Sequence, residues 1–172
     1  RAAELLGMDS AFSDPRLLII WHSRTGASKA MAQAAFEGAG AAGTLVMAGE
    51  AQPEMLLGTD GYLFCCPENL GSMSGLMKDM FDRAYYPLLG RIEGRPYATL
   101  IAAGSDGEGA QRQIDRIVTG WRLKRVAAPL IVNLAAQTPQ AILAPKTVPS
   151  KALNQCREIG AALAEGLRLG VF

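Results

Sequence analysis

The feature that most constrains the fold is a regular alternation of short apolar runs with segments of helical periodicity. The runs that predict strands are residues 17–21, 44–47, 62–66, 97–102 and 125–132. Apolar residues recur every three or four positions in the segments between them, which predicts helices. These helices are expected at residues 27–40, 53–57, 74–86 and 108–121, with a last one that Ser150 caps. Strands that are apolar on both faces and alternate with helices predict an α/β fold, in which helices cover both sides of a parallel sheet.

Length and composition favour a single domain. The chain has 172 residues, of which 49% are hydrophobic and 19% charged, and one core can stabilise a domain of this size. We therefore expect one domain over residues 1–172, with residues 1–15 as an N-terminal extension. No apolar run is long enough for a membrane span. Residues 1–16 lack the apolar stretch of a signal peptide, so we do not expect one.

Charge and cysteine content exclude several classes of function. The formal net charge is +1, which gives no reason to expect a nucleic acid or a membrane surface as partner. Three cysteines, of which Cys65 and Cys66 are adjacent, make a poor disulfide framework, and the chain has one histidine, His22. A structural zinc site is therefore not expected. We interpret the cysteines as small buried side chains of a cytoplasmic protein.

Three loops of unusual composition follow the carboxyl ends of predicted strands, where open α/β sheets bind ligands. The first loop is Ser23-Arg24-Thr25-Gly26-Ala27-Ser28. Its three hydroxyl groups lie beside the start of a helix, where backbone N–H groups and the helix dipole favour an anion. The loop is neither a Walker A motif nor G-x-G-x-x-G, so a phosphate monoester suits it better than a dinucleotide. The alternative is an ordinary helix start that Ser23 or Thr25 caps.

The other two loops are rich in glycine. The second, Pro67-Glu68-Asn69-Leu70-Gly71-Ser72-Met73-Ser74-Gly75, should end the preceding strand at its proline and lead into a helix that Ser74 could cap. The third, Gly104-Ser105-Asp106-Gly107-Glu108-Gly109, exposes backbone amides that can form an anion-binding concavity. Taken alone, each could be an ordinary connector. A further stretch, residues 133–149, is a long loop with three prolines, and loops of that length usually serve function or move.

These motifs resemble those of the flavodoxin-like superfamily, above all its branch of small NAD(P)H-dependent FMN reductases and quinone reductases. Residues 23–28 resemble that family's [TS]-x-[ST]-G-x-[ST] phosphate loop, and residues 67–83 (PENLGSMSGLMKDMFDR) resemble its second flavin loop. Gly94-Arg95-Pro96 is similar to its Gly-Lys-Pro lead into the fourth strand. The resemblance covers about residues 16–168. It implies a flavodoxin-like three-layer sandwich whose five parallel strands lie in the order 2-1-3-4-5.

The resemblance also implies a cofactor, FMN, and NADPH or NADH as electron donor. The hydroxyl groups of Ser23, Thr25 and Ser28 would hold the FMN phosphate, together with the backbone amides of Arg24, Gly26 and Ala27. Residues 67–72 would flank the ring system, and residues 104–109 would close its other side. No side chain is expected to act as acid, base or nucleophile, and no metal is expected, because the flavin carries the redox chemistry.

Two features favour an enzyme over an electron carrier of the same fold. Carriers of this superfamily are strongly acidic and stack the flavin ring between aromatic side chains. Here the net charge is +1, and no aromatic residue falls in the three loops or in residues 133–149. An open ring face leaves room for a nicotinamide or a quinone. We therefore expect NAD(P)H-dependent reduction of a quinone, a flavin or a similar small acceptor.

Other interpretations stay open at this point. The chain could be a flavodoxin-type electron carrier, a flavin-binding module without its own turnover, or an interaction protein that has lost flavin. A homodimer or homotetramer could supply aromatic side chains to the site, and the exposed candidates are Phe12, Tyr85 and Tyr86.

Several side chains near the loops have two interpretations each. His22 is expected to be packed or hydrogen-bonded at a strand end rather than catalytic. Arg24 would either reach a phosphate or stay solvated. Glu68 and Asp106 would either orient the flavin or remain in water. Lys78 and Arg83 are expected on the exposed face of the helix at residues 74–86.

Overall fold

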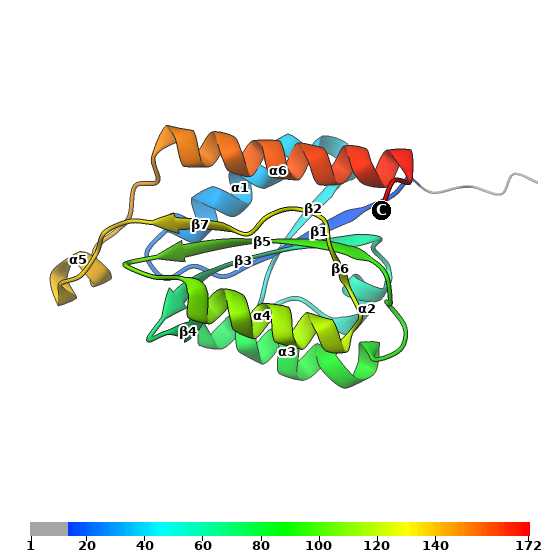
Figure 1. Ribbon diagram of the computed structural model, residues 1–172, viewed down its shortest axis with the longest axis horizontal. Helices are drawn as coiled ribbons and strands as arrows, with labels where there is room; N and C mark the ends of the chain where they lie inside the picture. Colours follow the sequence, from blue (N-terminus) through cyan, green and yellow to red (C-terminus); the bar gives the residue numbers. More distant parts are fainter. Residues whose placement is uncertain (1–13) are drawn as a thin grey trace, which may run out of the picture.

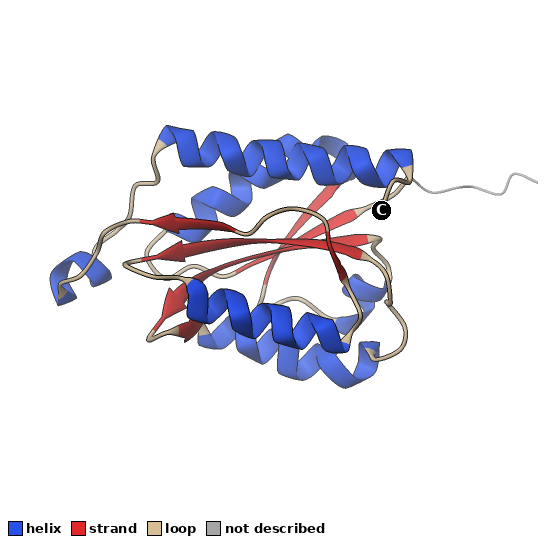
Figure 2. Cartoon of the chain, in the orientation of Figure 1, coloured by secondary structure: helices blue, strands red, loops and turns tan. Residues whose placement is uncertain are grey.

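The computed structural model describes residues 14–172 and forms a three-layer α/β sandwich (Figure 1). Its strands are β1 (Leu17–Trp21), β2 (Gly43–Met47), β3 (Gly61–Asn69), β4 (Ser72–Met73), β5 (Pro96–Ala103), β6 (Lys124–Arg125) and β7 (Leu130–Asn133). Its helices are α1 (Ala27–Ala39), α2 (Pro53–Leu57), α3 (Gly75–Leu88), α4 (Glu108–Gly120), α5 (Pro139–Leu143) and α6 (Ser150–Leu169), with a 3₁₀ turn, η1, at Gly40–Ala42. Figure 2 shows the sheet between two helical layers.

The strand order confirms the predicted topology. The sheet runs β2-β1-β3-β5-β6, with β7 also paired to β5. All of these pairs are parallel, and only the short β4 runs antiparallel, against β3. The order reverses between β1 and β3, because the chain first builds outward to β2 and then returns past β1. Such a reversal is where ligands bind in open α/β sheets, outside the carboxyl ends of the strands.

Two strand predictions and one cap prediction are wrong in detail. The strand expected at residues 125–132 is split into β6 and β7, which pair with opposite ends of β5. Pro129 lies in the gap, and a proline cannot donate to a strand ladder. The strand expected to stop at Pro67 continues to Asn69, because the Pro67 carbonyl accepts a hydrogen bond from the Ser74 amide (3.2 Å). Pro149, rather than Ser150, is the N-cap residue of α6.

Each face of the sheet has its own core. Helices α1 and α6 cover one face, and α2, α3 and α4 cover the other (Figure 1). Alternate residues of β1 divide between them, so that Ile19 faces α1 and α6 whereas Ile20 faces the opposite layer. Both side chains are fully buried. Among residues 14–172, no helix has both the length and the apolar character that crossing a membrane requires.

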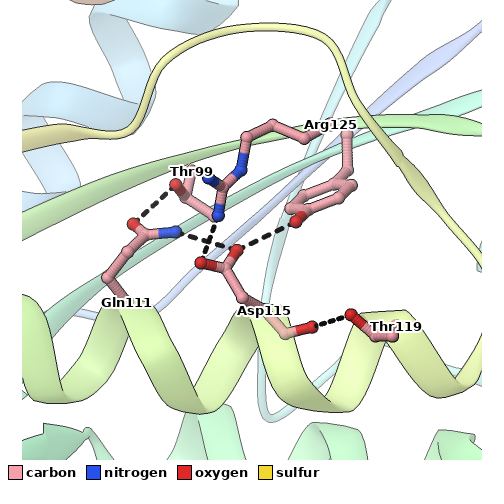
Figure 3. Close-up of polar contacts among 6 residues, drawn as sticks. Thr99, Gln111, Asp115, Thr119 and Arg125 are labelled. Carbon is pink, nitrogen blue, oxygen red and sulfur yellow. Dashed lines mark hydrogen bonds and ion pairs between the residues drawn. The ribbon is translucent and has the colours of Figure 1, made fainter.

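A polar network holds α4 against the edge of the sheet (Figure 3). The Thr99 hydroxyl donates to the Gln111 side-chain oxygen (2.7 Å), and the Gln111 amide donates to the Asp115 carboxylate (3.1 Å). The same carboxylate accepts the Tyr97 hydroxyl (2.8 Å) and pairs with Arg125. Because these groups come from β5, α4 and β6, the network positions α4, whose first turn contacts the β3–β4 hairpin.

Candidate functional site

The first loop turns sharply into α1. Gly26 is the N-cap residue in the left-handed conformation (φ 99°), which a glycine adopts without strain. Its amide donates to the Ser23 hydroxyl oxygen (3.0 Å), which closes the loop. Neither Ser23 nor Thr25 is the N-cap residue, so the alternative of a helix start capped by them is wrong. The first amides of α1 have no acceptor within the helix, and they point toward the loop.

Ser28 has the most informative environment in this loop. Its side chain is fully buried in the first turn of α1, and its Oγ has no hydrogen-bond partner. A buried hydroxyl without a partner costs free energy, so such groups are rare in folded proteins. Ser28 borders the cavity that the three loops enclose. An anion at the start of α1 would give the hydroxyl an acceptor and would also meet the helix dipole.

The second loop is a β-hairpin braced by α4. The Glu68 carboxylate accepts the backbone amides of Gly107 (2.9 Å) and Ala110 (3.1 Å), so it caps the start of α4. The amide of Met73 in β4 donates to the Gln113 side chain of α4 (2.8 Å). Glu68 is therefore not a solvated loop acid, and the Gly107 amide of the third loop already has an acceptor.

The hairpin also touches α4 directly. A Cβ atom on Gly109 would lie 2.0 Å from the Gly71 carbonyl oxygen, so only glycine allows this approach. The contact and the Glu68 and Gln113 hydrogen bonds make the second and third loops one unit.

A cavity of about 470 Å³ lies where the three loops meet, at the carboxyl ends of the strands. That size is typical of small-molecule sites. Most of the predicted site residues line it, namely Ser23, Arg24, Thr25, Ala27, Ser28, Pro67, Glu68, Asn69, Leu70, Gly71, Gly104 and Ser105. Four others lie beside it without lining it: Gly26, Ser72, Asp106 and Gly107. Among the residues that the structure describes, no aromatic side chain lines the cavity.

Four lining residues were missed by sequence reasoning: Ala102, Ala136, Ile142 and Leu143. The last two belong to α5, a short helix inside the stretch expected to be a long loop. A signal was present, because that stretch exceeds the length of an ordinary connector and carries two adjacent aliphatic residues between prolines. Lys146 ties this segment to the first loop, since its amide donates to the Thr25 carbonyl (2.8 Å).

His22 links the first loop to the second. Its Nδ1 lies 2.8 Å from the Ser74 Oγ, which confirms a hydrogen-bonded histidine at a strand end. Ser74 is the N-cap residue of α3, but its hydroxyl bonds to His22 and makes no capping bond. Burial, with the nearby positive charge of Arg24, lowers the pKa of His22 below 6.5. The lowered pKa favours the neutral form of the ring at pH 7.

Lys78 and Arg83 were both expected on the exposed face of α3, but Arg83 is partly buried. Lys78 forms an exposed ion pair with Asp82. The Arg83 guanidinium is partly buried and donates to the carbonyls of Ala48 (2.8 Å) and Ala51 (2.7 Å). The expectation for Arg83 is therefore wrong, because these carbonyls at the turn after β2 lie within reach of α3.

The three cysteines are unpaired and buried, as predicted. Burial raises the pKa of the Cys66 thiol to about 12 and that of Cys156 to about 11. Burial also raises the pKa of Cys65, whose thiol donates to the Ser28 carbonyl (3.2 Å). None of these thiols is a nucleophile at neutral pH.

The fold and the cavity define the class of protein. A parallel sheet in the order β2-β1-β3-β5, with a hydroxyl-rich loop at the start of α1 and a cavity at the strand-order reversal, is the flavodoxin-like arrangement. The NADPH-dependent FMN reductase family matches residues 46–138, more than half of the chain. The chain belongs to this family. The matched part contains the second and third loops.

Proteins similar to this chain include flavodoxins. The chain is 33% identical over 108 residues to a flavodoxin of Aquifex aeolicus (strain VF5). The aligned region covers 60% of this chain and 58% of that flavodoxin. The match thus spans little more than half the length of that relative. A flavodoxin from the domain Archaea has the same fold, with a TM-score of 0.71, 16% identity, and coverage of 89% of this chain and 99% of that one. A WrbA-like flavodoxin from Agrobacterium tumefaciens has the same fold, with a TM-score of 0.68 and 20% sequence identity. The alignment covers 90% of this chain and 98% of that one.

Proposed function

We propose that this protein is an FMN-dependent oxidoreductase that uses NAD(P)H to reduce a quinone, a flavin or a similar small acceptor. The observation that supports it best is the cavity that the three loops enclose, which has an unpartnered buried hydroxyl at one end and no aromatic side chain among its described lining residues. The first feature suits a phosphate, and the second suits a flavin ring with a free face.

The residues present fit FMN. In this proposal the Ser28 hydroxyl donates to the phosphate, beside the hydroxyls of Ser23 and Thr25 and the first amides of α1. The hairpin at Pro67–Gly71 and the turn at Gly104 and Ser105 would hold the ring. When bound, FMN supplies the two-electron redox chemistry, and the protein supplies binding and orientation.

The chain's own contribution is rigid positioning. Glu68 fixes the hairpin to α4, and Arg83 fixes the turn after β2. Neutral His22 joins the phosphate loop to α3 without placing a second positive charge beside Arg24. The overall reaction balances as NAD(P)H, one proton and the oxidised acceptor giving NAD(P)⁺ and the reduced acceptor. Two electrons pass from the nicotinamide to the acceptor, and solvent supplies the proton.

An electron carrier is the second candidate, and the match to the Aquifex aeolicus flavodoxin favours it. Carriers of this fold dock on basic partners through an acidic surface. The net charge of +1 gives this chain no such excess of acidic groups. The lack of an aromatic side chain at the cavity also leaves the ring face open to a second planar molecule. We therefore favour the reductase.

Assembly and location belong to the same proposal. Of the three aromatic side chains considered for a subunit contact, Phe12 lies outside the described residues and Tyr85 is only partly exposed, because it stacks on Trp121. Tyr86 is strongly exposed in α3, and we propose a homodimer or homotetramer that would cover it. Three buried, unpaired thiols suit a reducing compartment. We propose the cytoplasm as the place where the protein works.

Two measurements test the reductase. Mass analysis of the chromophore that heat releases from the purified protein should identify FMN. Steady-state assays should show NADPH or NADH oxidation that depends on an added quinone, nitro compound, azo compound or free flavin. FMN binding without turnover on any acceptor in this panel would favour the electron carrier.

A further inference from the structure

The tip of the β3–β4 hairpin carries a residue that its turn does not favour. Asn69 pairs with Ser72, so Leu70 and Gly71 form a two-residue turn. Both have positive φ, 53° and 75°, which is the pattern of a type I′ turn, where Asn-Gly is strongly preferred. A leucine is strained in this conformation. Its side chain is also fully exposed, so Leu70 contributes to neither the turn nor the core.

The hairpin holds Leu70 in place despite this strain. Glu68 and Gln113 tie both strands of the hairpin to α4, and Gly71 packs directly on Gly109. Backbone strain that a rigid surrounding maintains is characteristic of functional sites. Leu70 lines the cavity described above, so the strained residue and the site coincide.

Two more exposed aliphatic side chains line the same cavity from another part of the chain. Ile142 and Leu143 in α5 are 50% and 71% exposed. The segment is anchored by Lys146, whose amide donates to Thr25 and whose ammonium donates to the carbonyls of Ile142 (2.9 Å) and Ala144 (2.6 Å). Exposed apolar groups that gather at one site usually mark a binding surface. We call Leu70, Ile142 and Leu143 the aliphatic rim.

We propose that the aliphatic rim binds the electron acceptor and selects an uncharged planar molecule of the quinone class over a charged one. The inference rests on the proposed function. Burial of aliphatic side chains against a planar apolar molecule stabilises the complex. These side chains provide no hydrogen bond or opposite charge to compensate the desolvation of a charged group. FMN would occupy the cavity itself, but the three rim side chains are half or more exposed, so a second small molecule could contact them from the solvent side. Lys146 is a positioning residue for the rim, since it holds the end of α5.

The substitution Leu70→Asn tests this proposal, because a type I′ turn favours asparagine at this position. Leu70→Asn places the favoured Asn-Gly pair in the turn, so the midpoint of urea unfolding should stay the same or rise. The same variant removes an apolar contact. We expect the dissociation constant of 2-methyl-1,4-naphthoquinone for the FMN-loaded protein to rise about five- to tenfold, measured through the flavin spectrum. Leu143→Asn should act in the same direction.

Matched controls separate the rim from general effects. Leu169 is 57% exposed near the end of α6 and does not line the cavity, so Leu169→Asn should leave quinone binding unchanged. The dissociation constant of FMN, followed by flavin fluorescence, should change less than twofold in Leu143→Asn, because α5 is not among the segments proposed to hold the flavin. Sedimentation of each variant shows whether the rim instead contacts a second copy of the chain.

The outcomes are distinct. An unchanged quinone dissociation constant in FMN-loaded Leu70→Asn would overturn the rim alone. So would a loss of FMN affinity in Leu143→Asn as large as its loss of quinone affinity, because the rim would then act on the flavin. A change in oligomeric mass with unchanged quinone binding would also overturn it. A wild-type protein that takes up no FMN would overturn both the rim and the proposed function.

Discussion

At the scale of single residues, a change at Ser28 should weaken FMN binding without lowering the stability of the FMN-free protein. Its hydroxyl is buried without a partner, so Ser28→Ala should leave the FMN-free protein as stable as the wild type or about 1 kcal/mol more stable. If the hydroxyl donates to a phosphate, the same change should weaken FMN binding about ten- to a hundredfold. Fluorescence titration measures the FMN affinity, and urea unfolding measures the stability.

Two controls sharpen this prediction. Riboflavin lacks the phosphate, so its affinity should be the same in the wild type and in Ser28→Ala. Ser150→Ala changes an exposed serine at the start of α6 and should leave FMN affinity unchanged. An equal loss for FMN and riboflavin would show that Ser28 does not contact the phosphate.

The reactivity of the three buried cysteines gives a second prediction for single residues. Because burial raises the pKa of each thiol, Cys66 to about 12, the folded protein should react with a chromogenic disulfide reagent at pH 8 only as fast as it unfolds. Three thiols should react at once in denaturant. A thiol that reacts at once in the native protein would contradict the burial described here.

At the scale of elements, the α4 helix and the hairpin depend on one carboxylate. Glu68→Gln weakens two hydrogen bonds that a charge strengthens at the start of α4, and it should lower the free energy of unfolding by about 1–2 kcal/mol. Glu108→Gln removes an exposed acidic group from the first turn of the same helix and should cost less than about 0.5 kcal/mol. Equal losses of unfolding free energy in Glu68→Gln and Glu108→Gln would show that each carboxylate stabilises α4 only through the helix dipole.

The network around Asp115 predicts a pH dependence (Figure 3). Burial alone would raise the pKa of this carboxyl, but hydrogen bonds from Arg125, Gln111 and Tyr97 together hold it below 3.8. A lowered pKa stabilises the folded state above the unfolded pKa, and this contribution is lost as the pH falls through the folded value. Asp115→Asn should therefore cost about 1–2 kcal/mol at pH 7.

The difference between wild type and Asp115→Asn should shrink as the pH falls below about 4. Urea unfolding at a series of pH values measures it. A difference that stays constant down to pH 2 would show that the ionised carboxylate is not what stabilises the network.

Elements also show what the sequence can and cannot predict. The strands at residues 17–21 and 97–102 follow from their apolar runs, and helix 53–57 follows from its proline start. The cap of α4 by Glu68 could not be predicted, because donor and acceptor lie 39 residues apart in the chain. The hairpin escaped prediction because leucine stands where Asn-Gly would have indicated a turn. Local patterns therefore predict elements, whereas long-range contacts decide how the site is braced.

At the scale of the whole molecule, topology places the candidate site. Three loops far apart in the sequence meet because β1, β3 and β5 are adjacent and parallel, so their carboxyl ends share one edge of the sheet. The loop composition and this rule together predicted most of the cavity lining. The part contributed by α5 was missed, because nothing in a strand pattern says that a later segment folds back across the edge.

We propose that this protein accepts electrons directly from NAD(P)H through bound FMN. Rapid anaerobic mixing of the FMN-loaded protein with excess NADPH, and separately NADH, tests it most directly by the flavin absorbance. We predict that at least one of the two nucleotides bleaches the flavin within seconds without any other protein, and that adding a quinone restores the oxidised spectrum. A flavin that stays oxidised for many minutes with both nucleotides, yet is reduced once a separate reductase is added, would rule out the reductase and identify an electron carrier.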